Sequence, residues 1–227
     1  MKTVATLQHR VHIDSLISPG NAPFKTCSLV HVTKAPVLSA ESCRLIIDEA
    51  ESAASKNGWR SRYTLQKNCD EMHVSDLPGA SRLLAEALPF LARTAVSCLL
   101  PPPFAASDMR VHNALIVRYD AEKRRNYMPA HGDFSLLTMN IALNSDYDGG
   151  GTWFQALGGD GGQVVSAGGT GNAILHAGSL WHAGAATTTG LRYILVIFFH
   201  SAGYVDHSTR LQTRATARLQ AGILRLY

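Results

Sequence analysis

The sequence predicts a mostly β fold, an antiparallel sandwich or barrel supported by helices near its N-terminus. Two helical patterns come first and several short strand patterns follow, without the alternation of strand and helix that a parallel sheet requires. Many of the 19 glycines lie between residues 148 and 171, where tight turns would join short strands. With 227 residues, the chain is long enough for one domain with a sizeable core.

The N-terminal region begins with an arm and a first helix. Residues 1–24 show no clear period, and residues 27–32 form a short strand candidate. A helix should begin after Ser39, a favourable N-cap residue, because apolar residues then recur at helical spacing. Gly58 should end this helix.

A second helical pattern covers residues 79–99, and we expect a break or kink at Pro89 inside it. The stretch 59–78 between the two helices is polar and irregular, so it reads as a loop that could cover a site. From residue 109 the pattern changes to strands and turns. Strands are expected at residues 111–119, 139–143, 152–157, 163–166, 172–175 and 191–199.

The C-terminal residues 205–227 are expected to form a helix. Leu211, Leu219 and Ile223 lie on one stripe of it, and a row of arginines lies on another. That row is either a solvated face or the surface of a homodimer or another partner. These patterns divide the chain into an arm (1–24), a helical support region (25–108), a β core (109–204) and a C-terminal helix (205–227).

The composition is that of a globular protein, with 46% hydrophobic and 17% charged residues. The net charge of +4 would favour an anionic ligand, and no basic patch interleaved with aromatic residues indicates a nucleic-acid partner. The first residues lack the apolar stretch of a signal peptide, and the longest apolar run, residues 193–199, is too short to span a bilayer. We therefore expect a cytoplasmic protein without a membrane contact.

The four cysteines lie far apart and form no C-x-x-C pair. This spacing indicates neither a zinc framework nor a disulfide scaffold. We expect free or buried thiols at Cys27, Cys43, Cys69 and Cys98.

A candidate metal site lies at His131-Gly132-Asp133. Residues two apart on a strand point to the same face, so the imidazole and the carboxylate would project side by side. One more nitrogen ligand would complete two histidines and one carboxylate, a set that suits Fe(II) with open positions for substrate and oxygen. His176 and His182 compete for that place, and Arg192, ten residues after His182, favours His182.

Arg192 begins an apolar strand in which it shares a face with Ile194, Val196 and Phe198. It should therefore point into an apolar interior, and a buried guanidinium requires an anion. No carboxylate is nearby in the sequence, so a dicarboxylic ligand bound through two hydrogen bonds would serve.

The order His131-x-Asp133, His182 and Arg192 resembles the Fe(II)- and 2-oxoglutarate-dependent dioxygenases, and most resembles their collagen prolyl- and lysyl-hydroxylase branch. The resemblance covers about residues 111–199. Several local motifs are similar to those of the lysyl hydroxylases: Thr138-x-Asn140-Ile141-Ala142-Leu143-Asn144, Asp148-Gly149-Gly150-Gly151-Thr152-x-Phe154 and His176-x-Gly178-x-Leu180. One residue, Ala130, is extra between Met128-Pro129 and His131 compared with those enzymes.

This resemblance implies a double-stranded β-helix core, also called a jelly roll or cupin-like barrel. His131, Asp133 and His182 would bind Fe(II), and Arg192 would pair with the far carboxylate of 2-oxoglutarate. His176 is expected to have a structural or supporting role beside the ligands.

Other polar residues would line the cosubstrate. Tyr119 is expected to donate its hydroxyl and Asn140 its amide, and Thr138 and Thr152 are possible lining residues. Asn140 has the wrong parity to share a face with His131 in one continuous strand, so the chain must turn after Asp133. Phe134, Trp153 and Trp181 flank the site in sequence and are expected to pack in the core, with a wall of the substrate site as the alternative.

The implied protein is an oxidoreductase that hydroxylates an amino acid side chain, with lysine or proline favoured, in a peptide or as the free amino acid. Such an enzyme consumes O2 and converts 2-oxoglutarate to succinate and CO2, and by analogy it would need ascorbate to keep iron reduced. Two alternatives stay open. The same cofactors could act on a nucleic-acid base or a small metabolite, or the chain could be a non-oxidative metal-binding protein of the cupin type.

Overall fold

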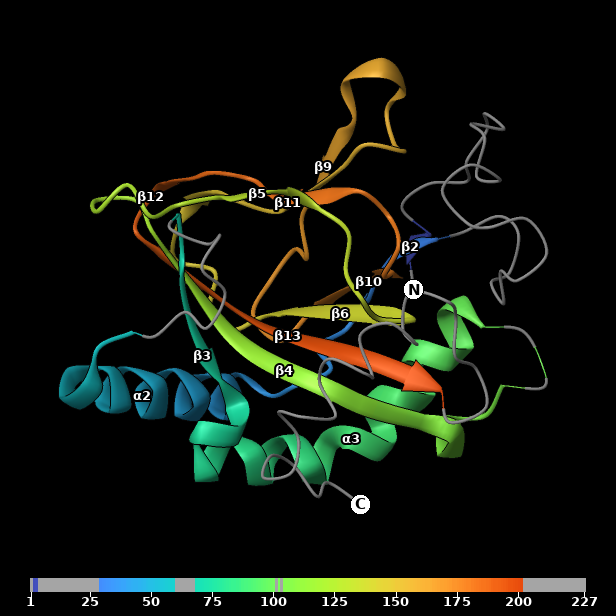
Figure 1. Ribbon diagram of the computed structural model, residues 1–227, viewed down its shortest axis with the longest axis horizontal. Coiled ribbons are helices and arrows are strands. Elements are labelled where there is room, and N and C mark those ends of the chain that lie inside the picture. Colours follow the sequence, from blue (N-terminus) through green and yellow to red (C-terminus); the bar gives the residue numbers. More distant parts are fainter. Residues whose placement is uncertain (1, 4–28, 60–67, 101, 103, 202–227) are drawn as a thin grey trace.

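The computed structural model describes residues 2–3, 29–59, 68–100, 102 and 104–201. Two helices lie against one face of a large curved sheet, and shorter strands close over its other face (Figure 1). All the paired strands are antiparallel. This is the expected mostly β architecture with a jelly-roll core and supporting helices, so the predicted fold class is confirmed.

The large sheet has seven strands in the order β1-β2-β10-β6-β13-β4-β3. Their bounds are β1 Lys2–Thr3, β2 Val30–Val32, β10 Ala173–Ala177, β6 Leu137–Ala142, β13 Leu191–Ser201, β4 Met109–Asp120 and β3 Asp70–His73.

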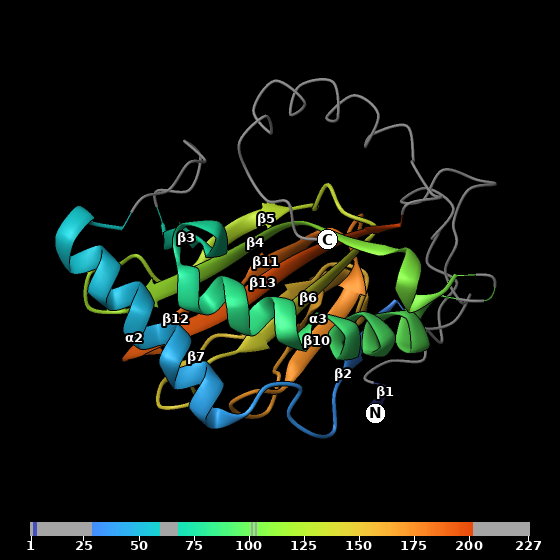
Figure 2. The same cartoon turned by 90° about the horizontal axis from the view of Figure 1, so that it is seen from below.

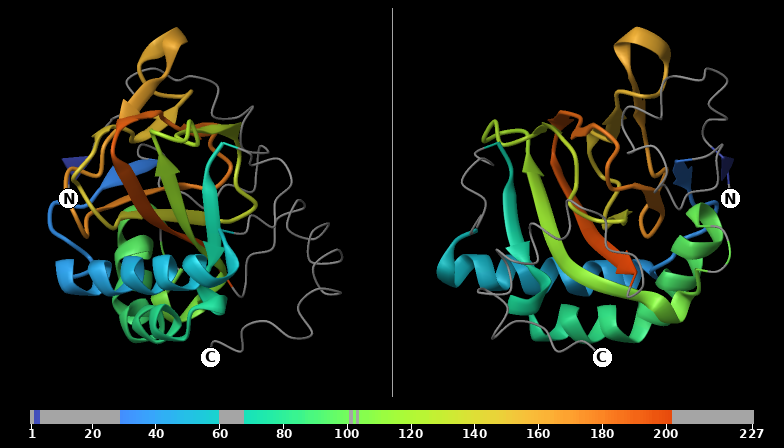
Figure 3. Two further views of the ribbon diagram at one scale, coloured as in Figure 1. Left: turned by 90° about the vertical axis from the view of Figure 1, so that its left-hand side faces the viewer. Right: turned by 45° about the vertical axis from the view of Figure 1, so that its right-hand side comes forward.

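A second sheet of four strands, in the order β5-β11-β8-β9, closes the barrel, and β12 pairs with β7 beside it. The hairpin of β8 and β9 projects from the barrel on the side away from the helices (Figure 3). The bounds are β5 Met128–His131, β11 His182–Gly184, β8 Thr152–Phe154, β9 Gln163–Val165, β12 Thr187–Thr189 and β7 Asp148–Gly149.

The two helices, α2 Ala40–Asn57 and α3 Pro78–Leu99, lie side by side across the large sheet (Figure 2). Ser39 caps α2 as expected, because its hydroxyl accepts the backbone N–H of Ser42, and Gly58 ends it with φ 71°. Glu49 of α2 accepts the backbone N–H groups of Gly79 and Ala80 and so caps α3 from outside. Three short 3-10 helices, η1 Val74–Asp76, η2 Ala106–Asp108 and η3 Gly159–Gly161, occupy connections.

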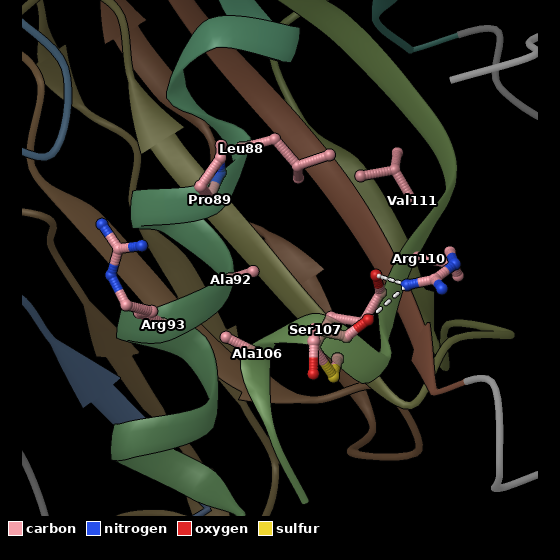
Figure 4. Close-up of a pocket in the computed structure, with 9 residues that line it drawn as sticks. Leu88, Pro89, Ala92, Arg93, Ala106, Ser107, Arg110 and Val111 are labelled. Carbon is pink, nitrogen blue, oxygen red and sulfur yellow. Dashed lines mark hydrogen bonds between the residues drawn. The ribbon is translucent and has the colours of Figure 1, made fainter. Parts of the chain in front are cut away.

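The second helix continues through Pro89, so the helix does not break at that residue, and the alternative of a kink there stays a prediction. Packing of its apolar residues against the sheet holds the helix together across the missing N–H. A groove between α3 and the start of β4, lined by Leu88, Pro89, Ala92 and Val111, lies on this helix-covered side (Figure 4).

Alternation along the strands gives the large sheet two different faces. On what we call the helix face, Leu195 of β13 pairs with Ile116 and Ile141 and packs under the helices. On what we call the barrel face, Ile194 pairs with Val117 and belongs to a separate apolar cluster inside the barrel. The two faces therefore separate a structural core from the interior of the barrel.

Several expectations differ from the structure or lie outside it. Residues 70–73, within a stretch expected to be an irregular loop, form the edge strand β3, which the sequence pattern missed because its residues are mostly polar. Most of the N-terminal arm, residues 60–67 and the expected C-terminal helix with its arginine row lie outside the described residues.

Of the cysteines, Cys43, Cys69 and Cys98 are buried free thiols as expected, and Cys27 lies outside the described residues. Within the described ranges, no helix is both long enough and apolar enough to cross a lipid bilayer.

Candidate functional site

The three predicted metal ligands come together at one end of the barrel. His131 ends β5 and lies opposite His182 of β11 in the sheet register, and their rings are 4.4 Å apart between centroids. Asp133 follows β5, with its carboxylate 3.4 Å from Nε2 of His131 and 3.6 Å from Nε2 of His182. The three potential ligand atoms lie within 4.8 Å of one another.

Backbone carbonyl groups orient both histidines. Nδ1 of His131 donates to the carbonyl of Pro129 and Nδ1 of His182 to that of Leu180, each over 2.8 Å. Because each Nδ1 is engaged with a carbonyl group, Nε2 is the nitrogen of each ring that faces Asp133 and could bind a metal. Two imidazole nitrogens and one carboxylate form the donor set that suits non-haem Fe(II), so the side chains fit that metal.

Asp133 is held in its ionised form. Burial alone would raise its pKa, but the hydrogen bond to His131 and the neighbouring histidine and threonine side chains hold the pKa at about 2. Its other oxygen accepts the hydroxyl of Thr138 over 2.5 Å, and that hydroxyl lies 2.8 Å from Ser135. Burial lowers the pKa of His182, which favours the neutral imidazole that a metal requires. Thr138 thus contacts a candidate metal ligand.

His176 is a third histidine beside the three candidate metal ligands and is 0% exposed. Its Nδ1 donates to the carbonyl of Ala177, and its Nε2 lies 4.0 Å from Asp133 without a hydrogen-bond partner. Burial, followed by the charge of His182, lowers its pKa to about 3, so the ring is neutral. His176 therefore packs in the interior against the candidate ligands, with its ring 4.5 Å from that of His182 between centroids.

Arg192 of β13 is buried on the barrel face, 3% exposed. Its guanidinium carbon lies 4.8 Å from the centre of the Tyr119 ring and 5.9 Å from that of Tyr147. Its Nε and Nη1 atoms have no hydrogen-bond partner, and no carboxylate of the described residues forms a salt bridge with it. The burial of Arg192 agrees with its predicted orientation into the barrel, and its binding of an anionic ligand stays a prediction.

Glycines keep backbone and side chains close around Arg192. A Cβ on Gly150, which has φ 69°, would approach Cδ of Arg192 to 2.8 Å. A Cβ on Gly184 would lie 2.5 Å from the hydroxyl of Tyr119. The contacts of Gly150 and Tyr147 with Arg192 were not predicted from the sequence. The glycine run after Asp148 was the available signal, because glycines allow the backbone to approach another group closely.

The other predicted cosubstrate residues are also buried inside the barrel. Tyr119 pairs with Arg192 in the register of β4 and β13, and burial raises the pKa of its phenol, so the hydroxyl stays protonated. Asn140 lies on the same face of β6 as Thr138, because the chain bends at residues 134–136 as its parity required. Thr152 of β8 pairs with Gly184 of β11.

Two of the three aromatic residues near the candidate metal ligands are more exposed than expected. Phe134 is 58% and Trp181 is 45% exposed, so packing in the core is the wrong role for both. They lie on the bends that follow Asp133 and precede His182, outside the strands whose inner positions fill the core. Trp153 is half-buried and donates its indole N–H to the carbonyl of Gly161. Two exposed rings beside the candidate metal ligands fit the alternative of a substrate wall.

One further polar residue of the barrel interior was missed. Glu71 of β3 is 1% exposed and pairs with Val117, whose side chain belongs to the apolar cluster of the barrel face. No sequence signal pointed to it, because the strand that orients it was not recognised.

Several known proteins are similar in sequence to this chain. No family model matches the chain. The "Multifunctional procollagen lysine hydroxylase and glycosyltransferase LH3" of Homo sapiens is 30% identical over 171 residues, which cover 72% of this chain and 22% of that protein. The "Procollagen-lysine,2-oxoglutarate 5-dioxygenase 1" of Mus musculus is 43% identical over 90 residues, covering 37% of this chain and 12% of the relative. The chain thus spans less than a quarter of the length of these relatives.

Solved structures share the fold. A prolyl-4-hydroxylase from Pseudomonas putida superposes with a TM-score of 0.59 at 14% identity, covering 77% of this chain and 93% of that one. The viral collagen prolyl hydroxylase of Paramecium Bursaria Chlorella virus-1, solved as a 2OG complex, gives 0.51 at 16% identity and covers 77% and 96%. The predicted resemblance is therefore confirmed: the chain is similar in sequence to procollagen lysine hydroxylases and has the jelly-roll fold of 2-oxoglutarate- and Fe(II)-dependent oxygenases.

Proposed function

We propose that this protein is an Fe(II)- and 2-oxoglutarate-dependent dioxygenase that hydroxylates an amino acid side chain, with lysine and proline as the candidates. The observation that carries the proposal is the pairing of two sites inside one barrel. A cluster of two histidines and one carboxylate shares the interior with a buried arginine whose Nε and Nη1 atoms have no hydrogen-bond partner. The relatives named as lysine hydroxylases and the prolyl hydroxylase structures support the same chemistry.

The metal site would use His131, Asp133 and His182. Fe(II) bound there would supply the activation of O2 that amino acid side chains cannot provide. The carbonyl groups of Pro129 and Leu180 would hold both rings in place, and Thr138 would hold the second oxygen of Asp133.

The cosubstrate site would use Arg192. Its unpartnered Nε and Nη1 atoms would each donate a hydrogen bond to the far carboxylate of 2-oxoglutarate. The rings of Tyr119 and Tyr147 would fix the plane of the guanidinium, and the protonated Tyr119 hydroxyl could donate to the same carboxylate. The apolar residues of the barrel face would exclude water, which strengthens these interactions.

Finer features of the proposal concern substrate and conditions. The substrate would be a peptide or a free amino acid, O2 would be consumed, and succinate and CO2 would form. A need for ascorbate, a homodimer and a cytoplasmic location stay predictions from the sequence.

The test measures succinate formation from 2-oxoglutarate by the purified protein with Fe(II) and O2, with and without lysine- and proline-containing peptides. We expect turnover by the wild type and its loss in His182→Ala, because the metal loses a ligand. His112→Ala is the matched control, since His112 is a half-buried histidine on β4 that lies outside the candidate ligand group.

Two results would contradict the proposal. One is the absence of succinate under all these conditions together with no spectral change when 2-oxoglutarate meets the Fe(II) protein anaerobically. The other is full turnover in His182→Ala. The first result would favour a non-oxidative metal-binding protein.

A further inference from the structure

The bend at residues 134–136, which leads from Asp133 to β6, is held in place by Gly178. The backbone N–H of Asp133 donates to the carbonyl of Gly178 over 2.8 Å, and the N–H of Gly178 donates to the carbonyl of Leu136 over 3.1 Å. A Cβ added to Gly178 would collide with the carbonyl group and the hydroxyl of Ser135, so the bend lies directly on this glycine. The backbone beside the candidate metal ligand Asp133 is therefore fixed from both sides.

Two hydroxyl groups of this region form a hydrogen-bond chain that ends on Asp133. Oγ1 of the buried Thr138 donates to Oδ2 of Asp133 over 2.5 Å, and Oγ of the half-buried Ser135 lies 2.8 Å from Oγ1 of Thr138. A hydroxyl group carries one proton, and Thr138 uses its proton for the carboxylate. Its oxygen can therefore only accept from Ser135, which gives the chain one direction, from Ser135 through Thr138 to Asp133.

This direction matters for the orientation of the carboxylate. While Oδ2 of Asp133 accepts the proton of Thr138, Oδ1 lies 3.4 Å from Nε2 of His131. Rotation of the carboxylate would break the first contact and move Oδ1 away from the histidine. Hydrogen bonds in a chain polarise one another, so donation by Ser135 strengthens the bond from Thr138 to Asp133. Without Ser135, the Thr138 hydroxyl would hold the carboxylate less firmly.

We infer that Ser135 is a positioning residue of the metal site, whose hydroxyl donates to Thr138 and so fixes the group that orients Asp133. This inference rests on the proposed function. Ser135 lies one hydrogen bond beyond Thr138, so its effect on a bound metal must pass through Thr138. Removing Thr138 should therefore abolish the contribution of Ser135.

The test is a double-mutant cycle in which Mn(II), as a redox-stable probe, is titrated calorimetrically into the wild type, Ser135→Ala, Thr138→Val and the double variant. We expect Ser135→Ala to bind Mn(II) about five- to tenfold more weakly than the wild type, because an orienting group is lost. The double variant should bind Mn(II) within about twofold of Thr138→Val, because residues that act through one another are not additive.

Ser145→Ala is the matched control, since it removes a serine hydroxyl that Thr170 contacts over 3.2 Å at an exposed site, and it should keep the affinity of the wild type. The titration gives the number of sites and the dissociation constant separately, so a partly unfolded variant does not distort the comparison.

The inference is overturned if Ser135→Ala binds Mn(II) as tightly as the wild type. It is also overturned if Ser135→Ala weakens binding by the same factor with and without Thr138, as a general disturbance of the bend would do. A wild-type protein that binds no Mn(II) contradicts the proposed function itself, which is a different result from equal affinities of the wild type and Ser135→Ala.

Discussion

Two buried arginines on neighbouring strands have opposite surroundings. Arg118 of β4 pairs with Tyr193, and Arg192 of β13 pairs with Tyr119, so the two side chains leave the same sheet in opposite directions. On the helix face, Arg118 donates to Asp70 over 2.6 and 3.0 Å and to Glu51 over 3.0 Å. On the barrel face, Arg192 contacts two tyrosine rings, and its Nε and Nη1 atoms have no hydrogen-bond partner.

The difference separates a buried charge whose partners belong to the fold from one that, in the proposed function, would bind a ligand. The network around Arg118 is closed, because Tyr193 also donates to Glu51 and Arg125 donates to the second oxygen of Asp70. It joins α2 to the strands β3, β4 and β13 and to Arg125 in the loop after β4. Arg192 has no such counterpart among the described residues, and the anion of the proposed function would compensate its desolvation.

The largest effect should follow from breaking the closed network with Arg118→Met. The change leaves Asp70 and Glu51 without their main cation, and we expect the free energy of unfolding to fall by about 3 kcal/mol, since Arg125 still holds Asp70. Denaturant unfolding followed by circular dichroism measures it. A loss below about 1 kcal/mol would show that the network contributes little to stability.

Thr138→Val tests the proposed metal site, because it removes the hydroxyl that donates a hydrogen bond to Asp133, a candidate metal ligand. Metal affinity should fall about 10- to 100-fold, because groups that orient a ligand have effects of that size. Calorimetric titration with Mn(II), as a redox-stable substitute for Fe(II), measures it. Thr189→Val is the matched control, since it removes a similar hydroxyl–carboxylate bond to Asp148 at an exposed site. Equal affinities of the two variants would contradict the assignment.

Gly150→Ala tests whether the close contact of Gly150 with Arg192 is needed for the binding of 2-oxoglutarate. The new methyl group would press on the side chain of Arg192, and overpacking of this kind costs about 1–3 kcal/mol, so 2-oxoglutarate should bind about tenfold or more weakly. Gly159→Ala is the control, because that glycine has a similar φ of 76° and a Cβ added to it would meet nothing within 4 Å. If both variants bind 2-oxoglutarate equally, the close approach of residue 150 to Arg192 does not affect the binding of 2-oxoglutarate.

The smallest effect should come from Arg192→Met in the absence of ligand. Because the substitution removes a buried charge that lacks a counter-ion among the described residues, the free energy of unfolding should stay constant or rise by about 1 kcal/mol. The same unfolding experiment as for Arg118→Met measures it. A loss as large as that of Arg118→Met would mean that both arginines have structural roles.

Parts of the candidate site could be predicted from the sequence where the alternation of residues along a strand determines which face a side chain points to. The face that Arg192 shares with Ile194 and Val196 follows from the alternation of a strand. His131 and Asp133 do come together, but not through that alternation, because β5 ends at His131 and Asp133 follows it. The bend after Asp133 was likewise required by the parity of Asn140.

The missed features depend on contacts between distant segments. Glu71 lies in a polar stretch without a period, and its strand forms through pairing with β4, a distant part of the chain. Continuation of α3 through Pro89 depends on packing that a local rule for proline does not include. The exposure of Phe134 and Trp181 follows from bends whose direction the closure of the barrel determines.

The central claim, that Arg192 awaits the carboxylate of 2-oxoglutarate, is tested most directly by ligand-dependent stability. The free energy of unfolding is measured for the wild type and Arg192→Met, each with Mn(II), with and without 2-oxoglutarate at about a hundred times its dissociation constant for the wild type. We predict that 2-oxoglutarate stabilises the wild type by about 2.7 kcal/mol and leaves Arg192→Met almost unchanged. An equal gain in both proteins would contradict the claim.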